Sequence, residues 1–490
     1  MSPVAATNGA RPHRWLAFAV LLLAGFMDLL DGTIVFVALP TIARDLDATF
    51  ASLEWVVAGY ALAFALTLIT GGRLGDIYGR RRMFLTGVAG FTLASLAAGL
   101  APTAEVLIAS RVVQGVMAGV MVPQVLSIAQ VIFTPRERFA AFAVYGIVLS
   151  LAAVIGPLLG GLLTELDLAG LGWRPIFLIN LPVGAVAFAA AARLVPESRS
   201  PHPLQLDLVG VGLVSAALLL LLYPMIEGQA LGWPAWTFVA MASSVPLFVV
   251  FAVWERRKSR RDGSPLTEPS LFRARSFVAG LLLSLVLFSG VASFWFVLVL
   301  WLQVGLGFTP LTTALAGLAW PAAVMASGAA GAKLAGTVGR RLLNFGLGLM
   351  AAGVAGVIAT VGLVGQATEP WHLAPALLVG GIGMGITMPS LFDFILAEVP
   401  SRHAGSASGV VNTVAQIGGA AGIAIVGAIF FGLVEGMSAA PAETFTAAIE
   451  RTLGYQVAAF ASSALLAFLL PGRVASREAE GAWSPHDPVA

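Results

Sequence analysis

The chain alternates between long apolar segments and short polar connections along almost its whole length. Each apolar segment holds about 20 residues, the length of helix that crosses roughly 30 Å of hydrocarbon. The short segments of alternating apolar and polar residues that mark an outer-membrane barrel are not seen in the sequence. The pattern predicts an all-α membrane protein with fourteen transmembrane helices, near residues 15–38, 53–72, 83–101, 105–133, 140–164, 175–193, 206–226, 236–255, 277–302, 311–332, 342–364, 374–397, 406–433 and 453–471.

Composition supports this class and argues against enzymes. Of the 490 residues, 58% are hydrophobic and 11% are charged, whereas a soluble protein carries about 25% charged residues. The sequence contains no cysteine, so disulfides and thiolate metal sites are excluded. No phosphate-binding loop, catalytic triad or metal-ligand cluster is recognisable. We therefore expect a secondary transporter that uses no cofactor, takes its energy from an ion gradient and binds no nucleic acid.

The basic residues predict how the chain is oriented. With a cytoplasmic N-terminus, only Arg44, Arg174 and Arg451 of the 27 lysines and arginines fall in outside segments, and Arg111 lies within a span. Cytoplasmic loops of membrane proteins carry such an excess of positive charge. The sequence thus predicts a multi-pass protein of the cytoplasmic (inner) membrane with both termini in the cytoplasm, and we expect a monomer.

Two internal repeats divide the chain. "GRLGDIYGRRR" at residues 72–82 is echoed by "AKLAGTVGRR" at 332–341, and the segment 119–138 is echoed by 385–403. Parallel repeats of this kind are typical of transporters whose site lies between the two halves. The predicted organisation is a cytoplasmic tail (1–14), a six-helix bundle (15–193), two additional helices (194–255), a basic cytoplasmic linker (256–276), a second six-helix bundle (277–471) and a C-terminal tail (472–490).

Several motifs resemble those of a known family. The segment 72–82 is similar to the signature loop of the major facilitator superfamily, and "AAVIGPLLGG" at 152–161 resembles the antiporter motif of its export families. The segments "LDGTIVFVALP" (30–40), "RVVQG" (111–115) and "WRPIFLINLPVG" (173–184) narrow the resemblance to the fourteen-span drug:proton antiporters. The match covers nearly the whole chain. It departs from the family pattern at Phe36, Pro175 and Gly336, the last of which stands where the second loop would carry an acid.

The resemblance implies a fold of two pseudo-symmetric six-helix bundles with two extra central helices. It also implies roles for two sets of residues. The first set forms a conformational switch loop, although its arginines can also be explained as membrane anchors: Gly72, Asp76, Gly79, Arg80 and Arg81. The second set forms the antiporter motif and limits leakage, unless it serves close helix packing alone: Gly156, Pro157, Gly160 and Gly161.

Two acids in the first span point to proton coupling. Asp28 lies near the middle of this span, and Asp31 lies one turn further out on nearly the same helical face. Asp31 is about 13 Å and Arg111 about 9 Å from the outer ends of their helices, so they lie at compatible depths. Burial and a nearby cation act in opposite directions on a carboxyl group, which can then titrate near neutral pH. We predict that Asp31 carries the proton and that Arg111 is its counter-ion; a permanent structural pair is the alternative.

The role of Asp28 stays open between a second proton site, a carboxylate that binds cationic substrate and a hydrated cavity residue. Apolar walls with few polar groups suit amphipathic cations, and aromatic faces favour them further. For some of the candidate residues of the substrate cavity there is a second explanation: their side chains form hydrogen bonds between helices or lie in water at a helix end. These candidates are Gln114, Gln124, Asn180, Trp295, Asp393, Asn412 and Gln416.

The resulting functional prediction is a proton-coupled antiporter that exports hydrophobic or cationic small molecules, such as drugs, dyes or antibiotics, by alternating access. Its expected partners are the small-molecule substrate, protons and the lipid bilayer. A dedicated lipid or metabolite exporter on the same fold is one alternative, because the motifs report coupling and not substrate. A non-transporting membrane sensor is another, but retention of Asp31, Arg111 and Asp76 argues against it.

Overall fold

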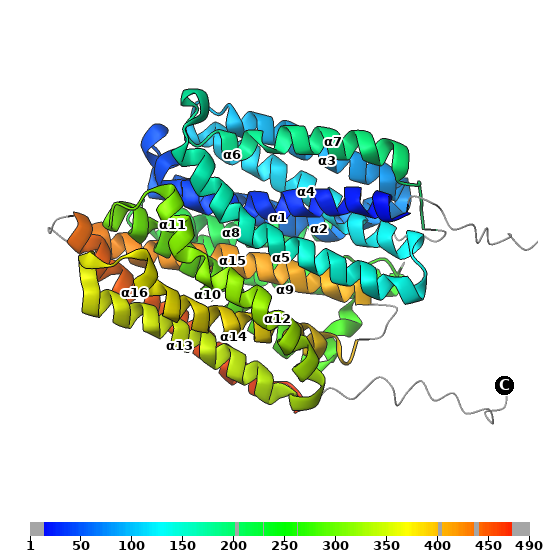
Figure 1. The fold of residues 1–490 in the computed structure, drawn as a ribbon. Helices are drawn as coiled ribbons and strands as arrows, with labels where there is room; N and C mark the ends of the chain where they lie inside the picture. Colours follow the sequence, from blue (N-terminus) through cyan, green and yellow to red (C-terminus); the bar gives the residue numbers. More distant parts are fainter. Residues whose placement is uncertain are drawn as a thin grey trace, which may run out of the picture.

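The protein is seen here as a computed structural model that describes residues 14–200, 205–228, 230–261, 263–399, 404–435 and 441–472. Most of both predicted tails lies outside these residues. The described part of the chain consists of helices and their connections and contains no β-strand (Figure 1). Fourteen of its helical segments are long and apolar enough to cross a membrane, in agreement with the hydropathy pattern.

Twelve spans are built on single long helices and two are broken. The sixth span is divided into α6 and α7, and the tenth into α11 and α12, while α10 ends in a π-helical turn at Trp301–Gly305. The α-helices are α1 (Arg14–Asp45), α2 (Phe50–Tyr78), α3 (Arg80–Gly99), α4 (Ala104–Ile132), α5 (Pro135–Glu165), α6 (Pro175–Leu178), α7 (Asn180–Leu194), α8 (Leu208–Glu227), α9 (Ala235–Arg261), α10 (Arg275–Leu300), α11 (Pro310–Gly317), α12 (Ala319–Val338), α13 (Arg340–Val364), α14 (Pro370–Leu396), α15 (Ala404–Glu435) and α16 (Pro441–Leu466).

Local sequence sets many of the helix starts. The hydroxyl of Thr49 accepts a hydrogen bond from the Ser52 N–H at the start of α2, and Thr309 does the same for Thr312 before α11. Several helices run past the predicted span limits: α1 continues to Asp45, and α9 continues to Arg261, six residues into the predicted linker. Hydropathy marks where the lipid ends, and a helix can continue beyond that point into water.

We call the end of the bundle at which α1 begins the inner end and the opposite end the outer end. Helices α1–α7 pack mainly on one another, and so do α10–α16 (Figure 1). The additional helices α8 and α9 pack together, and α8 contacts α2 on one side and α15 on the other. The domain boundaries proposed from the sequence stay a prediction.

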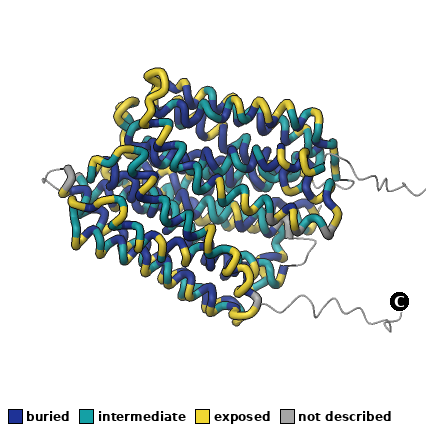
Figure 2. Tube along the Cα trace, in the orientation of Figure 1, coloured by how far each residue is buried: buried dark blue, intermediate teal, exposed yellow. Residues whose placement is uncertain are grey.

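The hydrophobic core is continuous between the two groups of helices towards the outer end. The outer part of α1, from Leu30 to Ile42, belongs to a large cluster that also includes α10, α13, α14, α15 and α16. The inner part of α1, from Ala17 to Met27, belongs to a separate cluster built from residues that precede Pro196 in the chain. Buried residues accordingly fill the interior, and exposed ones lie on the periphery (Figure 2).

Specific contacts join the two groups of helices at the outer end. The Gln303 amide donates to the Val37 carbonyl at 2.7 Å, the Leu311 N–H donates to Glu165 at 3.3 Å, and the Phe50 and Phe431 rings stack with centroids 3.8 Å apart. The first bond fixes α1 against the π-helical end of α10. We call the outer end closed because these contacts join the two groups there.

The inner ends of α1 and α5 are joined within the first group. Arg14 and Glu137 form an ion pair at 2.6 Å. Hydrogen bonds from the Thr134 hydroxyl and backbone N–H, with the charge of Arg14, hold the pKa of Glu137 below its usual range. The same bonds cap α5 at its start.

Candidate functional site

Asp31 lies at the centre of a buried polar network between α1, α4 and α7. Its side chain is fully buried, and its carboxylate forms an ion pair with Arg111, whose side chain is 1% exposed. The proximity predicted by counting depth along the two helices is thus present. An ion pair without water costs much desolvation energy and needs further hydrogen bonds to compensate, so the neighbours of this pair matter.

Amide donors complete the coordination of Asp31. The amide nitrogens of Gln114 and Asn180 both donate to Oδ1, at 2.8 and 2.7 Å, while Arg111 donates to Oδ2. The same two amides contact the Ser95 hydroxyl, at 2.8 and 3.3 Å. Asp31 thus accepts three hydrogen bonds and donates none, which is the pattern of an ionised carboxylate.

Arg111 also has partners besides Asp31. Its Nη1 donates to Gln114 Oε1 at 2.6 Å, and its Nε donates to the Val56 carbonyl at 3.1 Å. The guanidinium carbon lies 4.1 Å from the centroid of the Tyr60 ring and 5.7 Å from that of the Phe177 ring. A cation near aromatic faces is favoured, most strongly where water is excluded. Arg111 therefore has contacts that remain if Asp31 loses its charge.

Asp28 belongs to the same constellation but is less enclosed. Its side chain is half-buried, and the Tyr60 hydroxyl donates to its Oδ1 at 2.5 Å. Because the Tyr60 ring also faces Arg111, the two acids of α1 are joined by a continuous series of contacts through Arg111 and Tyr60. The structure thus brings together the three residues predicted to couple protons and adds Tyr60 between them.

The predicted antiporter motif lies where α5 approaches α1 and α11. A methyl group on Gly156 would lie 3.2 Å from the Leu30 carbonyl oxygen, and one on Gly160 would lie 2.8 Å from that of Ile34. On Gly161 it would lie 2.7 Å from the carbonyl oxygen of Pro310, at the contact between the two groups of helices. Pro157 lies inside α5 between them. Gly156 and Gly160 thus hold α5 directly against the part of α1 that carries Asp31, and Gly161 holds it against α11.

The predicted switch loop joins α2 to α3 at the inner end. Asp76 pairs with Arg80 at 2.8 Å, and Gly79 has a φ of +111°, which favours glycine. The backbone N–H groups of Arg81 and Arg82 donate to the carboxylate of Glu197, at 3.1 and 3.2 Å. Arg81 also donates to the Ala192 carbonyl. The loop is thus attached to the segment that follows α7, while a methyl group on Gly72 would make only an ordinary contact with Pro123.

The remaining substrate candidates lie apart from this network. Gln124 is fully buried and ties α4 to α2 by donating to the Gly71 carbonyl at 2.8 Å. Trp295 is half-buried in an aromatic group with Phe294 and Trp320. Asp393 and Asn412 are exposed, and Gln416 is half-buried. Of the seven candidates, only Gln114 and Asn180 contact Asp31, and a cavity role for the others stays a prediction.

Sequence reasoning missed three polar residues. Tyr60 and Ser95 complete the Asp31 network, and a tyrosine hydroxyl in an apolar helix usually finds a hydrogen-bond partner, which was a usable signal. Glu54 lies near the start of α2, is 3% exposed and has a carboxylate oxygen without a hydrogen-bond partner among the described residues. Those residues include no group of three or more potential metal ligands.

Comparison with known proteins agrees with the geometry. Residues 21–423 match the family described as Major Facilitator Superfamily. The chain is 42% identical to a probable actinorhodin transporter of Streptomyces coelicolor, over 89% of this chain and 76% of that protein. It is 35% identical to the puromycin resistance protein pur8 of Streptomyces alboniger (94% and 91%) and 30% identical to the multidrug efflux pump LfrA of Mycolicibacterium smegmatis (86% and 82%).

Solved structures agree in fold. A bacterial homolog of the human lysosomal transporter Spinster superposes with a TM-score of 0.65 at 16% identity, over 94% of this chain and 97% of that one. A peptide transporter, POT, gives 0.63 at 17% identity, over 93% and 96%. The chain therefore belongs to the Major Facilitator Superfamily, as one of its multi-pass drug and antibiotic efflux transporters and not an enzyme.

Proposed function

We propose that this protein is a proton-driven antiporter that exports hydrophobic or cationic small molecules by alternating access, with Asp31 as the proton carrier. Its inner end faces the cytoplasm in this proposal, with both termini on that side, and it acts as a monomer. The observation that carries the proposal is the fully buried Asp31–Arg111 pair, surrounded by amide donors at the turn of α1 against which α5 packs.

The cost of burying this pair supports a working role. A buried ion pair is often no more stabilising than apolar residues of the same size, but losing one partner is strongly unfavourable. Protonating Asp31 would remove the charge that Arg111 faces, while the Gln114 oxygen, the Val56 carbonyl and the Tyr60 ring would still hold the guanidinium. The pair can therefore exist in two states without leaving Arg111 isolated.

The proposed cycle couples these two states to the two ends of the transporter. With Asp31 ionised, the network of α1, α4 and α7 is complete, as in the structure, whose outer end is closed. Protonation weakens the contact between α1 and α4. The contact between α1 and α5 at Gly156 then transmits the movement of α1 to the contacts that close the outer end. One proton moving down 100 mV supplies about 2.3 kcal/mol, and a pH gradient adds to this.

We propose that Asp28 faces the substrate path and binds the positive charge of cationic substrates. It is more exposed than Asp31, and the Tyr60 hydroxyl orients its carboxylate. A cation that arrives at Asp28 lies near the Tyr60 hydroxyl and repels Arg111, whose guanidinium lies over the ring of that tyrosine. Substrate and proton would then act on one shared series of contacts.

Relatives narrow the substrate class without deciding it. One is a probable actinorhodin transporter, one confers resistance to puromycin and one is a multidrug efflux pump. The 42% identity to the first, over 89% of this chain, favours a second candidate function, the dedicated export of a single antibiotic. Competition assays with several unrelated compounds separate the two, because a dedicated exporter transports one of them and ignores the others.

The test uses purified protein in proteoliposomes with an imposed pH gradient, ethidium as the cationic probe and an internal pH dye. Ethidium should move against its gradient and protons should move in the opposite direction. Asp31→Asn should abolish both fluxes, whereas Asp47→Asn, which changes an exposed outer residue, should leave them intact. Ethidium movement that ignores the pH gradient would refute antiport.

Folding needs its own control, because Asp31→Asn leaves Arg111 buried without a counter-ion at a cost of about 3–5 kcal/mol. The double variant Asp31→Asn with Arg111→Gln removes both charges and should restore thermal stability. The double variant still lacks the carboxyl group proposed to carry the proton, so gradient-driven efflux should stay absent. If the double variant transports ethidium like the original chain, Asp31 is a structural residue.

A further inference from the structure

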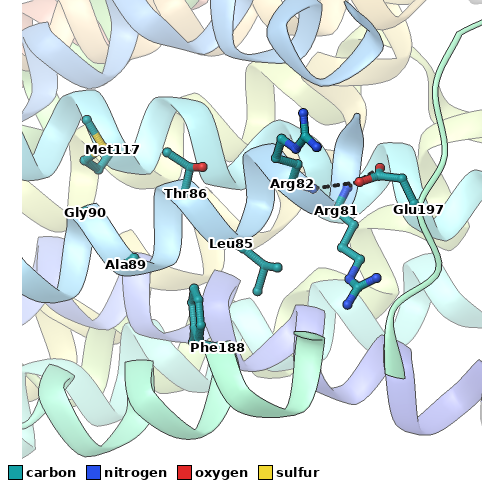
Figure 3. A pocket seen from close by; sticks show the side chains of 9 residues that line it. All are labelled: Arg81, Arg82, Leu85, Thr86, Ala89, Gly90, Met117, Phe188 and Glu197. Atoms are coloured by element: carbon teal, nitrogen blue, oxygen red, sulfur yellow. Dashed lines mark hydrogen bonds between the residues drawn. The ribbon is translucent and has the colours of Figure 1, made fainter. Parts of the chain in front are cut away.

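A groove opens on the periphery of the first group of helices and shares no lining residue with the Asp31 network. It lies between α3, α4 and α7, has a volume of about 640 Å³ and begins at the inner ends of these helices. Figure 3 shows Leu85, Ala89, Gly90 and Met117 along it, with Phe188 of α7 on the opposite wall. A groove of this lining on a membrane-spanning surface is filled by lipid chains unless a protein covers it.

The entrance of the groove is positively charged. Arg81 and Arg82 stand at the start of α3, and Arg82 is exposed with no ion-pair partner among the described residues. Arg81 donates to the Ala192 carbonyl through one terminal nitrogen, but its buried Nε has no partner within the same part of the chain. Arg193 and Arg199, on the adjoining segment, are also exposed.

Among the described residues that line the groove Glu197 is the one acid, and its carboxylate already has hydrogen-bond partners. Its carboxylate accepts the backbone N–H groups of Arg81, Arg82 and Ser198, at 3.1, 3.2 and 3.0 Å. It therefore sits at the positive end of the α3 dipole, which stabilises an anion there. The guanidinium groups remain available to a second anion, so the entrance keeps its net positive charge.

The dimensions of the groove match one membrane leaflet. From Arg82 to Gly90, α3 rises about 12 Å, whereas half of a hydrocarbon core is about 15 Å. Ala89, Gly90 and the flexible Met117 line the apolar part of the groove, further along the helices from the arginines. A charged head at the arginines would thus place a fatty-acyl chain along the apolar wall and against Phe188.

We propose that this groove is a binding site for an anionic glycerophospholipid of the inner leaflet, with the headgroup phosphate on Arg81 and Arg82 and an acyl chain between α3, α4 and α7. Basic pockets between helices at the cytoplasmic surface suit such headgroups. Because Arg81 and Arg82 directly follow the Asp76–Arg80 loop, a bound lipid would hold that loop against α7. The proposed orientation of the protein decides only which leaflet supplies the lipid, and the site itself does not depend on it.

The test places a fluorescent reporter in the groove of the full-length protein. Phe188→Trp is reconstituted into vesicles that contain brominated phosphatidylglycerol or brominated phosphatidylcholine in both leaflets, and quenching is corrected with the protein that retains Phe188. The indole introduced by this substitution should be quenched several-fold more by the anionic lipid. Arg82→Gln in this background should abolish the preference, whereas Arg256→Gln, the same change on an exposed residue of α9, should keep it.

A second variant separates headgroup from chain recognition. Ala89→Phe fills the apolar part of the groove and should reduce quenching by both lipids, because it removes the space for the acyl chain and leaves the arginines in place. Equal quenching by the two lipids before any change at Arg82, or a preference that survives Arg82→Gln, would overturn the proposal. The readout is binding and not transport, so it can succeed or fail independently of proton coupling.

Discussion

The loop between α2 and α3 and the loop between α12 and α13 share a backbone plan but not their chemistry. Gly79 and Gly339 both have positive φ angles, +111° and +67°, directly before the next helix. In the first loop the Arg80 N–H donates to the Ser198 carbonyl at 2.9 Å, and in the second the Arg340 N–H donates to Gly472 at 3.2 Å. Each loop is thus attached to the segment after the last helix of its own group.

The side chains differ. Arg80 is paired with Asp76, whereas the Arg340 guanidinium donates to the carbonyl oxygens of Phe468 and Leu470, at 3.0 and 2.7 Å. No acid is available to Arg340 from its own loop, because Gly336 occupies that place in the sequence. Arg80 is thus held by an ion pair that can break when the helices move. Arg340 instead caps the end of a helix by binding its backbone carbonyl groups.

The buried polar groups differ in the same way. Asp31 and Arg111 form a charged network in the first group of helices. In the second group, Gln456 donates to the Ser293 hydroxyl at 3.2 Å, and Tyr455 and Ser289 are 3.0 Å apart, with no formal charge involved. The two groups of helices thus differ in their buried polar contacts: those of the first group include an ion pair, and those named in the second group are hydrogen bonds between neutral side chains. We expect proton coupling to reside in α1–α7, which matched substitutions can test.

The largest difference is expected between two glutamines. Gln114→Leu removes a donor from Asp31 and an acceptor from Arg111. Leaving buried charges short of partners costs about 1–3 kcal/mol, and gradient-driven efflux should fall about tenfold or more. Gln456→Leu replaces one neutral bond, and its Oε1 already has no partner within the described residues, so transport and the midpoint of thermal unfolding should hardly change. Equal losses in the two variants would show that the charged network has no special role.

The next difference is expected between the two loops. Asp76→Asn should slow transport severalfold with little loss of stability, because an exposed i,i+4 ion pair contributes about 0.3–0.5 kcal/mol. Arg340→Gln should do the reverse, since it removes a cap and not a switch: unfolding should begin at a lower temperature while the transport rate of the folded protein is kept. The measurements that test this difference are the transport rate per folded molecule and the thermal unfolding curve, both from the same preparation of each variant. A slow but stable Arg340→Gln protein would contradict the distinction.

The sequence allowed much of this asymmetry to be predicted, and the reason is geometric. Hydropathy gave fourteen spans, which the structure contains, because span length follows from membrane thickness. Depth can be counted along each helix, so Asp31 and Arg111 could be predicted to lie at compatible heights. The absence of an acid from the second loop can also be read directly from the sequence, because Gly336 stands at that position.

The partners around the site could be predicted far less well. Counting gives the depth of a residue but not the rotation of its helix or the identity of the neighbouring helix. Asn180 was expected to line a cavity, and its contact with Asp31 depends on how α7 packs beside α1. The attachment of Glu197 to the start of α3 joins residues more than 100 positions apart, and no local pattern announces it.

The smallest expected difference lies between two tyrosines. Tyr60→Phe keeps the ring over Arg111 and removes the bond to Asp28, whereas Tyr455→Phe removes a bond to Ser289. A hydroxyl bond to a carboxylate contributes about 1.5–3 kcal/mol and one between neutral groups about 0.5–1.5 kcal/mol, so both proteins should fold. Tyr60→Phe should raise the KM for ethidium about threefold relative to that for the uncharged dye Nile red, because it releases the carboxylate proposed to bind cations. Tyr455→Phe should leave this ratio unchanged; an equal change in both variants would show that Asp28 does not select for charge.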